Sequence, residues 1–126
     1  MTDLVALGKG PMGPNRDGLE VIERDHPGDV AFESGELIAE CPLTGQPDLY
    51  NITITLRGTR TLESKSLKLY LWSWAGEGIF AEHLADRIAD DVFKVTRQDV
   101  DVELKQNVRG GIWTLVRAQR RPFNQF

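Results

Sequence analysis

Cysteine, histidine and long apolar runs are all scarce in this sequence of 126 residues. The single cysteine cannot form an intramolecular disulfide, which excludes a disulfide-stapled scaffold and is typical of the reducing cytoplasm. Because only two histidines accompany it, a zinc cluster is not expected, and we predict no metal site. The longest apolar-leaning run, residues 67–75, contains Lys68 and is too short to span a bilayer. The N-terminus lacks an apolar signal-peptide core, so we predict a cytoplasmic protein without membrane contact.

Basic residues are not in excess either. Nineteen acidic and fifteen basic side chains give a net charge of −4, which argues against broad electrostatic binding to nucleic acid. With 40% hydrophobic and 27% charged residues, the composition is that of one soluble globular domain. Residues 8–18 are dense in glycine and proline. We therefore expect residues 1–29 to form a mobile N-terminal arm or loop, followed by a single domain over residues 30–126.

The period of the hydrophobic pattern changes twice along the chain. Alternation of apolar and polar residues, loose over residues 30–40 and clearer over residues 48–57, predicts strands, and apolar residues at every third or fourth position predict helices. The predicted strands are residues 30–40, 48–57, 100–104 and 112–116, and the predicted helices are residues 64–74 and 80–92.

The resulting order, β-β-α-α-β-β, belongs to the α+β class, with an antiparallel sheet that carries both helices on one face. The other face carries threonine and charged residues and is expected to meet water or a lumen. Open sheet edges invite association, and several copies that continue the sheet into a barrel would remove them. We therefore predict a homo-oligomer.

Cys41 is a candidate nucleophile because it ends a predicted strand and lies in a turn-rich connection. A lone cysteine is also commonly a small buried hydrophobe, and this alternative stays open. Asp48 begins the next predicted strand and can face Cys41 across the turn, where a carboxyl group could accept the thiol proton and later supply it to a substrate. As a residue that follows Pro47, Asp48 is equally typical of an ordinary turn.

Lys65 and Lys68 lie on one face at the start of a predicted helix. Cations are normally favoured at the other end of a helix, so this pair indicates an anion site in which free N–H groups and lysines hold a phosphate together. Ser64 as a simple N-cap, or a solvated charged turn, is the alternative.

Glu82 and His83 lie at the start of the second predicted helix. A glutamate there is favourable for the helix dipole, but a carboxylate is also the right acceptor for the N–H edge of a guanine-like base. Arg109, before the Gly–Gly turn, is either a turn residue or a further phosphate contact. The three tryptophans are expected to pack in the core or at a subunit interface; they are Trp72, Trp74 and Trp113.

Four segments together resemble the unimodular QueF nitrile reductases. They are CPLTGQPD (41–48), ESKSLKLYL (63–71), the segment with Phe80 and Glu82, and RGG (109–111). These enzymes are NADPH-dependent reductases of 7-cyano-7-deazaguanine (preQ0) in queuosine biosynthesis, a tRNA modification. The family has the tunnelling fold, in which β-β-α-α-β-β subunits assemble into barrels that stack.

The resemblance implies a role for each matching residue. Cys41 would add to the nitrile carbon to give a covalent thioimide, and Asp48 would be the proton donor. NADPH would then supply two hydrides to give the aminomethyl product, preQ1. Substrate contacts would come from Leu62, Glu63, Ser64, Ala81 and Glu82, and cofactor phosphate contacts from Lys65, Ser66, Lys68 and Arg109. Such sites commonly form between subunits.

One position departs from the family pattern, because Ala81 stands where the family usually has histidine. His83 points about 200° from position 81 in steps of about 100° per residue, so it cannot occupy the same place without local rearrangement. Proton transfer would then use His83, another residue or water.

Three other functions fit parts of the same pattern. A QueF-like amidinotransferase that acts on preQ0 in tRNA would share Cys41 and Asp48, but its family lacks the ESKSLK string. A reductase that serves DNA modification would perform the same small-molecule step. A non-catalytic deazaguanine-binding module would keep Glu63 and Glu82 and reduce nothing.

Overall fold

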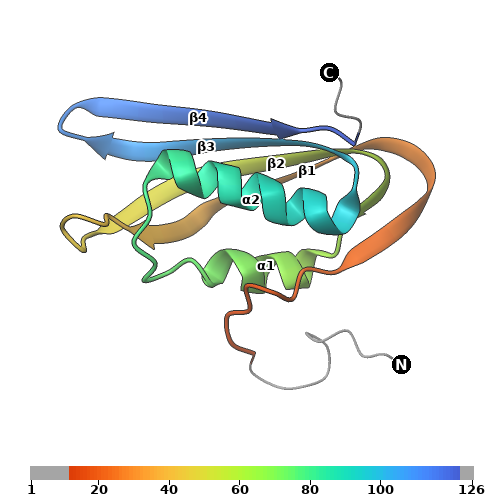
Figure 1. Cartoon of the computed structure of the whole chain (residues 1–126), viewed down its shortest axis with the longest axis horizontal. Helices are drawn as coiled ribbons and strands as arrows, with labels where there is room; N and C mark the ends of the chain where they lie inside the picture. The colour runs from red at the N-terminus through yellow and green to blue at the C-terminus, as the bar shows by residue number, and fades with distance from the viewer. Residues whose placement is uncertain (1–11, 123–126) are drawn as a thin grey trace.

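The computed structural model describes residues 12–122, which form a four-stranded antiparallel sheet with two helices on one face (Figure 1). The elements follow the predicted order, β-β-α-α-β-β. They are β1 (Val21–Glu40), β2 (Pro47–Leu62), α1 (Ser64–Trp72), α2 (Ala81–Thr96), β3 (Asp99–Arg109) and β4 (Ile112–Arg120). The predicted α+β class is therefore confirmed.

The strands lie in the order β1-β2-β3-β4, so each strand pairs with its neighbour in sequence. On β2 the residues that face the helices are buried, whereas the intervening residues are exposed or half-buried. The buried set begins with Asp48 and Tyr50 and continues through Ile52, Ile54 and Leu56. This alternation confirms a sheet with one dry face and one polar face.

The first strand begins at Val21, so the predicted boundary at residue 30 is wrong as a limit of regular structure. Residues 21–29 pair with the C-terminal part of β2, interrupted by a register shift between Glu23 and Gly28. The alternation is weak there because few of these side chains are buried, which hid the strand from pattern analysis.

The described part of the predicted arm is held against α1 and the residues that follow it. The Arg16 guanidinium lies 3.4 Å from the ring centroid of Trp74, donates to the Ser73 carbonyl at 2.7 Å and pairs with Glu77 at 3.2 Å. The Asn15 N–H donates to the Leu69 carbonyl at 3.0 Å. Residues 12–18 thus form a loop that these contacts hold against the domain, and residues 1–11 lie outside the described part.

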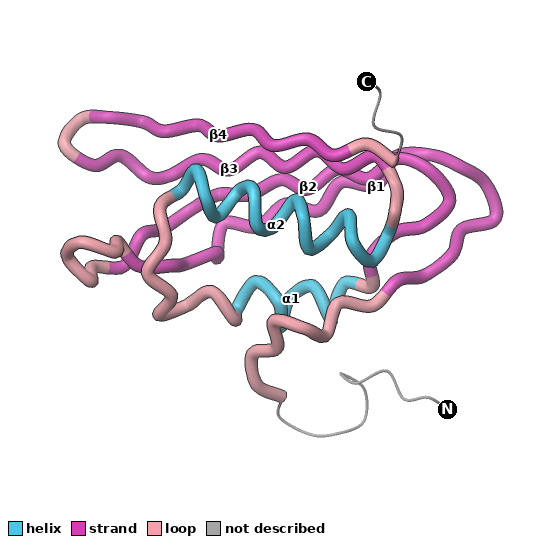
Figure 2. The backbone as a smooth tube through the Cα atoms, in the orientation of Figure 1, coloured by secondary structure: helices cyan, strands magenta, loops and turns pink. Residues whose placement is uncertain are grey.

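The two helices cover different parts of the sheet (Figure 2). α2 packs over β3 and β4, whereas α1 lies beside β1. Leu84, Ile88 and Val92 of α2 are fully buried, as their spacing predicts, but Phe80 precedes the helix and is exposed. α1 ends at Trp72, and Trp74 is buried beyond it while Trp72 itself is exposed.

The strand turns and the helix starts lie at two opposite ends of the sheet (Figure 1). The β1–β2 turn, the β3–β4 turn and the start of α2 lie together at the left of the view, and the start of α1 lies toward the right. Gly110 and Gly111 form the β3–β4 turn with φ values of 58° and 80°, which favour glycine. No helix among residues 12–122 is long and apolar enough to cross a membrane.

Candidate functional site

Cys41 lies at the start of the β1–β2 turn and is half-buried. Its N–H donates to the Gln46 carbonyl and its carbonyl accepts from the Gly45 N–H, both at 2.8 Å. Gly45 has a φ of 75°, so a glycine closes this turn without strain. The turn therefore fixes the Cys41 backbone and leaves its thiol accessible, which favours the nucleophile over the buried hydrophobe.

Hydrogen bonds within the turn lower the pKa of the Cys41 thiol below its ordinary value. The Thr44 side chain contributes most, followed by the backbone at Leu43 and Thr44. Asp48 acts in the opposite direction, because its negative charge disfavours a nearby thiolate. The turn, rather than the carboxylate, thus favours the reactive thiolate.

Asp48 is buried at 4% exposure, and its carboxylate forms an ion pair with Arg109. The same guanidinium donates to the Gln46 side chain at 3.0 Å, so Arg109 joins the end of β3 to the β1–β2 turn. Among the described residues no hydrogen bond joins Asp48 to Cys41. The sequence predicted Arg109 as a phosphate contact, and the structure places it against the predicted proton donor.

Glu82 is brought to the Cys41 turn by the segment that precedes α2. Glu40 and Gly78 form a parallel bridge, in which the Glu40 N–H donates to the Glu77 carbonyl at 2.8 Å and the Ile79 N–H donates to the Glu40 carbonyl at 3.1 Å. This bridge ties the start of α2 to the residue before Cys41. Glu82 is exposed in the first turn of α2, where a carboxylate complements the dipole.

Ala81 and His83 point in different directions, as the sequence predicts. Ala81 is buried, whereas His83 is exposed and its ring centroid lies 6.4 Å from that of Phe80. His83 therefore does not stand in for a side chain at position 81 in this structure.

The other predicted substrate residues lie at the start of α1, at the opposite end of β2. Leu62 is buried in the core, and Ser64 is exposed. Glu63, rather than Ser64, caps the helix, because its carboxylate accepts from the Lys65 N–H at 2.9 Å and the Ser66 N–H at 2.7 Å. The free N–H groups that the sequence predicted for a phosphate are thus already occupied.

The predicted cofactor residues on α1 differ in their accessibility. Ser66 is buried, and its hydroxyl donates to the Glu63 carbonyl at 2.8 Å and accepts from the Glu20 N–H at 3.0 Å. Lys65 and Lys68 are exposed, and neither forms an ion pair within residues 12–122. The two lysines are therefore free to bind an anion. The Ser66 hydroxyl instead bonds to residues that precede α1.

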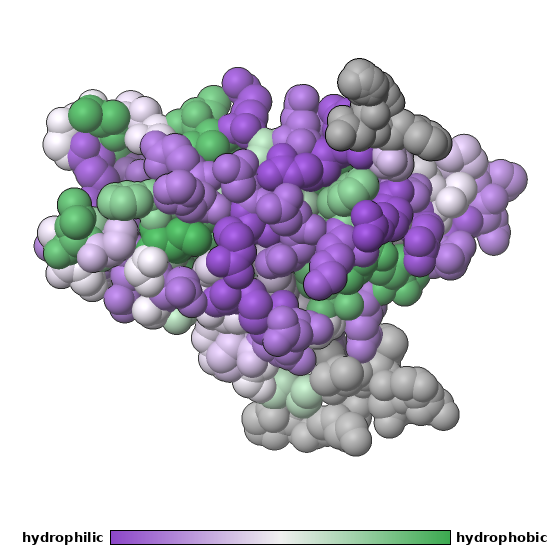
Figure 3. Space-filling view, viewed as in Figure 1, coloured by the Kyte–Doolittle hydropathy of each residue, from purple (hydrophilic) through white to green (hydrophobic). Residues whose placement is uncertain are grey.

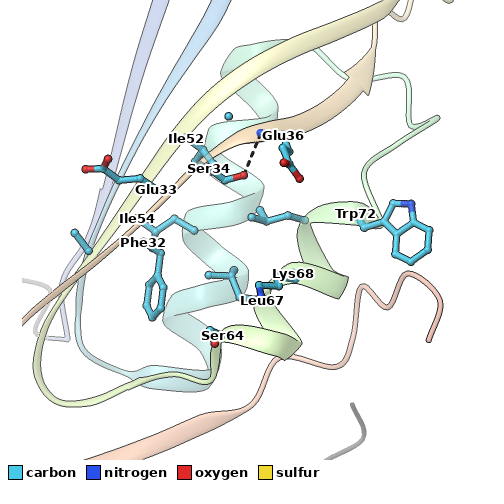
Figure 4. A pocket seen from close by; sticks show the side chains of 13 residues that line it. Phe32, Glu33, Ser34, Glu36, Ile52, Ile54, Ser64, Leu67, Lys68 and Trp72 are labelled. Carbon is cyan, nitrogen blue, oxygen red and sulfur yellow. Dashed lines mark hydrogen bonds between the residues drawn. The ribbon is translucent and has the colours of Figure 1, made fainter. Parts of the chain in front are cut away.

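A groove of about 830 Å³ lies between α1 and the neighbouring parts of β1 and β2 (Figure 4). Phe32, Leu67 and Trp72 line it with apolar surface, and Ser64 and Lys68 place polar groups at it. Sequence analysis missed this groove, because it depends on how α1 sits on β1. The sequence signal that could have indicated it is Trp72, an aromatic residue outside the apolar stripe of the predicted helix.

The predicted site residues form two clusters at opposite ends of the sheet. Cys41, Asp48, Glu82 and Arg109 form the turn cluster, and Ser64, Lys65 and Lys68 form the α1 cluster. At about 3.3 Å per residue, the stretch of β2 from Asp48 to Leu62 spans about 45 Å. One chain therefore does not bring the two clusters together.

Apolar surface gathers around the turn cluster. Figure 3 shows hydrophobic residues at the left end of the molecule, where both strand turns lie. The middle of the surface in this view is mostly hydrophilic. The exposed large apolar residues of these turns and adjoining strands include Leu43, Val108, Ile112, Trp113 and Leu115. Trp113 is therefore outside the core, which leaves an interface as its predicted role.

Comparison with known proteins places these features in a family. The family model for QueF-like protein matches residues 47–124. A relative from Anaeromyxobacter sp. (strain K), named NADPH-dependent 7-cyano-7-deazaguanine reductase, is 43% identical, and the match covers 86% of this chain and 93% of the relative. A relative of the same name from Syntrophus aciditrophicus (strain SB) is 42% identical, over 80% of this chain and 76% of its own length.

The fold also matches a solved structure. The archaeosine synthase QueF-Like in the apo form superimposes with a TM-score of 0.69 and 22% sequence identity, covering 79% of this chain and 98% of that one. At this identity the likeness shows the shared fold, which confirms the predicted tunnelling fold. Together with the family model and the curated relatives, it shows that the chain belongs to the QueF-like protein family.

Proposed function

We propose that this protein reduces the nitrile of 7-cyano-7-deazaguanine to an aminomethyl group, with NADPH as reductant, in queuosine biosynthesis in the cytoplasm. The observation that carries the proposal is the accessible Cys41 thiol with its lowered pKa, beside a buried carboxylate. The named activity of the curated relatives supports the same substrate and cofactor.

Cys41 starts the reaction by adding its sulfur to the nitrile carbon. The carbon–nitrogen triple bond becomes a double bond, a new carbon–sulfur bond forms, and the thiol proton moves to the nitrogen. Nothing leaves in this step, and the product is a thioimide. A nitrile is a poor hydride acceptor, and the polarised C=N of the thioimide is a better one. Covalent catalysis thus divides one difficult reduction into easier steps.

Asp48 carries the proton from the thiol to the nitrogen. Its burial beside Arg109 holds the carboxylate in one orientation at the turn, which a proton carrier requires. Glu82 recognises the N–H edge of the deazaguanine, because a carboxylate accepts from two parallel N–H groups.

NADPH supplies hydride when it is bound. In this proposal the α1 cluster binds it. The assignment is supported by Lys65 and Lys68, which are exposed cations without ion pairs among the described residues and suit phosphate. The groove beside Lys68 presents Phe32 and Trp72, which suit a flat aromatic ring. These residues would hold the cofactor.

A second copy of the chain completes the site in this proposal. The turn cluster and the α1 cluster lie at opposite ends of β2, so the turn cluster of one subunit meets the α1 cluster of another. Arg109 then reaches cofactor phosphates together with Lys65 and Lys68 of the neighbouring subunit. The apolar surface around the turns supports such a contact. In this proposal each subunit contributes one folded domain to a homo-oligomer.

The test is NADPH consumption with 7-cyano-7-deazaguanine, followed by absorbance, for the native protein and for Cys41→Ala. We expect two NADPH oxidised per nitrile and no oxidation by the variant. Conversion of the nitrile only when ammonia or glutamine is supplied, without NADPH oxidation, would instead show the amidinotransferase. Tight binding without any conversion would show the non-catalytic module.

A further inference from the structure

Tyr50 is a large side chain buried beside the turn cluster, and none of the roles above uses it. It lies two residues after Asp48 on β2, and residues two apart in a strand face the same side of the sheet. Both side chains are buried on the helix-facing side, Tyr50 at 1% exposure. The tyrosine ring is therefore fixed beside the proposed proton carrier.

The Tyr50 hydroxyl has no hydrogen-bond partner among the described residues. Buried hydroxyls are normally hydrogen-bonded, because leaving one unpaired costs free energy, and each exception calls for a partner from elsewhere. The nearby carboxylate of Asp48 is paired with Arg109 instead.

The charged groups that act on the phenol identify its surroundings. Burial raises the pKa of Tyr50 most, the negative charges of Asp48 and Glu82 raise it further, and Arg109 and Cys41 exert smaller effects. These four residues are the turn cluster. A phenol with an ordinary or raised pKa is protonated at neutral pH, so the hydroxyl is a hydrogen-bond donor.

Because the hydroxyl is buried, a ligand can reach it only if side chains of the turn cluster move. Glu82 is exposed and Cys41 is half-buried, so neither side chain is packed in the core, whereas Arg109 stays paired with Asp48. A flat base bound between Cys41 and Glu82 would then lie against the ring of Tyr50.

We propose that the Tyr50 hydroxyl is a substrate-binding group that donates a hydrogen bond to the deazaguanine held between Cys41 and Glu82. This inference rests on the proposed function and adds one residue to it. It explains why a polar atom is buried without a partner at this position.

The test measures binding separately from the covalent step. The dissociation constant of 7-cyano-7-deazaguanine is measured by calorimetry for Cys41→Ala and for Cys41→Ala/Tyr50→Phe, and the melting temperature of both is recorded. Phenylalanine keeps the ring and removes only the hydroxyl. We expect about tenfold weaker binding, the size of one lost hydrogen bond, at an unchanged or higher melting temperature.

Tyr70→Phe in the Cys41→Ala background is the matched control. The Tyr70 hydroxyl donates to Asp91 at 2.6 Å, so its loss should lower the melting temperature and leave binding unchanged. Equal binding with and without the Tyr50 hydroxyl would overturn this inference alone, as would a lowered melting temperature in Tyr50→Phe, which would reveal a partner within the chain. Failure of Cys41→Ala to bind the compound would overturn both this inference and the proposed substrate.

Discussion

The lowered pKa of Cys41 arises mainly from contacts within the turn that the cysteine begins. The turn that follows the cysteine directs the Thr44 side chain and two backbone groups at the thiol, and together they lower its pKa. A buried carboxylate two residues beyond the turn raises it, so the balance depends on short local contacts. The proposed activation of the nucleophile is thus assigned to the turn sequence.

Replacing Thr44 with valine tests this account at the scale of one side chain. Valine keeps the shape and removes the hydroxyl, so the pKa of Cys41 should rise and the pH profile of thiol alkylation should shift to higher pH. Since Cys41 is the only cysteine, alkylation reports on it alone. Thr53→Val, on the polar face of β2, should leave the profile unchanged. An identical profile for Thr44→Val would show that the turn does not activate the thiol.

Sequence analysis predicted Cys41 and Asp48 as site residues but not all of the contacts that they make. Cys41 and Asp48 stand out because a motif carries them, whereas the Asp48–Arg109 ion pair joins residues from different strands and depends on the register of β2 and β3. Tyr50 looks like an ordinary core residue in the alternating pattern. Its unpaired hydroxyl becomes visible only with coordinates.

At the scale of elements, Glu63 connects the end of β2 with the start of α1. Its carboxylate caps two N–H groups, and its backbone N–H donates to the Glu20 carbonyl at 2.8 Å. The residue that caps α1 is therefore one that the family resemblance assigns to substrate contact. The cap is a structural role that this residue has in a single chain.

Glu63→Ala should lower the free energy of unfolding by about 1 kcal/mol, the usual contribution of an N-cap side chain. Glu63→Asp should keep most of the stability, because aspartate is a good N-cap. Urea denaturation followed by circular dichroism measures both, with Glu36→Ala, an exposed residue of β1, as a control. Stability of Glu63→Ala equal to that of the native protein would contradict the assigned cap.

Element type and order follow from periodicity, and the element ends do not. The alternation of β2 and the stripe of Leu84, Ile88 and Val92 are strong because one face of each element is buried. The start of β1 at Val21 was missed because its first residues bury little surface, and the docking of Arg16 on Trp74 joins segments far apart in sequence.

At the scale of the whole molecule, the long sheet separates the turn cluster from the α1 cluster. If each complete site combines the two clusters from different subunits, two inactive variants should complement each other. Cys41→Ala removes the nucleophile, and Lys65→Glu/Lys68→Glu removes the exposed cations without disturbing an ion pair among the described residues.

Refolding equal amounts of the two variants together should restore about one quarter of the native activity, the statistical share of sites with both clusters intact. Each variant refolded alone is the control and should stay inactive. If mixing restores no activity although both variants assemble to the native size, the site does not combine these clusters from different subunits.

The mass of the intact protein after incubation with 7-cyano-7-deazaguanine tests the central claim most directly. Because addition of the thiol expels no leaving group, the account predicts a gain of one whole substrate per chain without NADPH. It also predicts return to the free mass when NADPH is added, and no gain in Cys41→Ala. An unchanged mass for the native protein, or the same gain in the variant, would contradict Cys41 as the nucleophile.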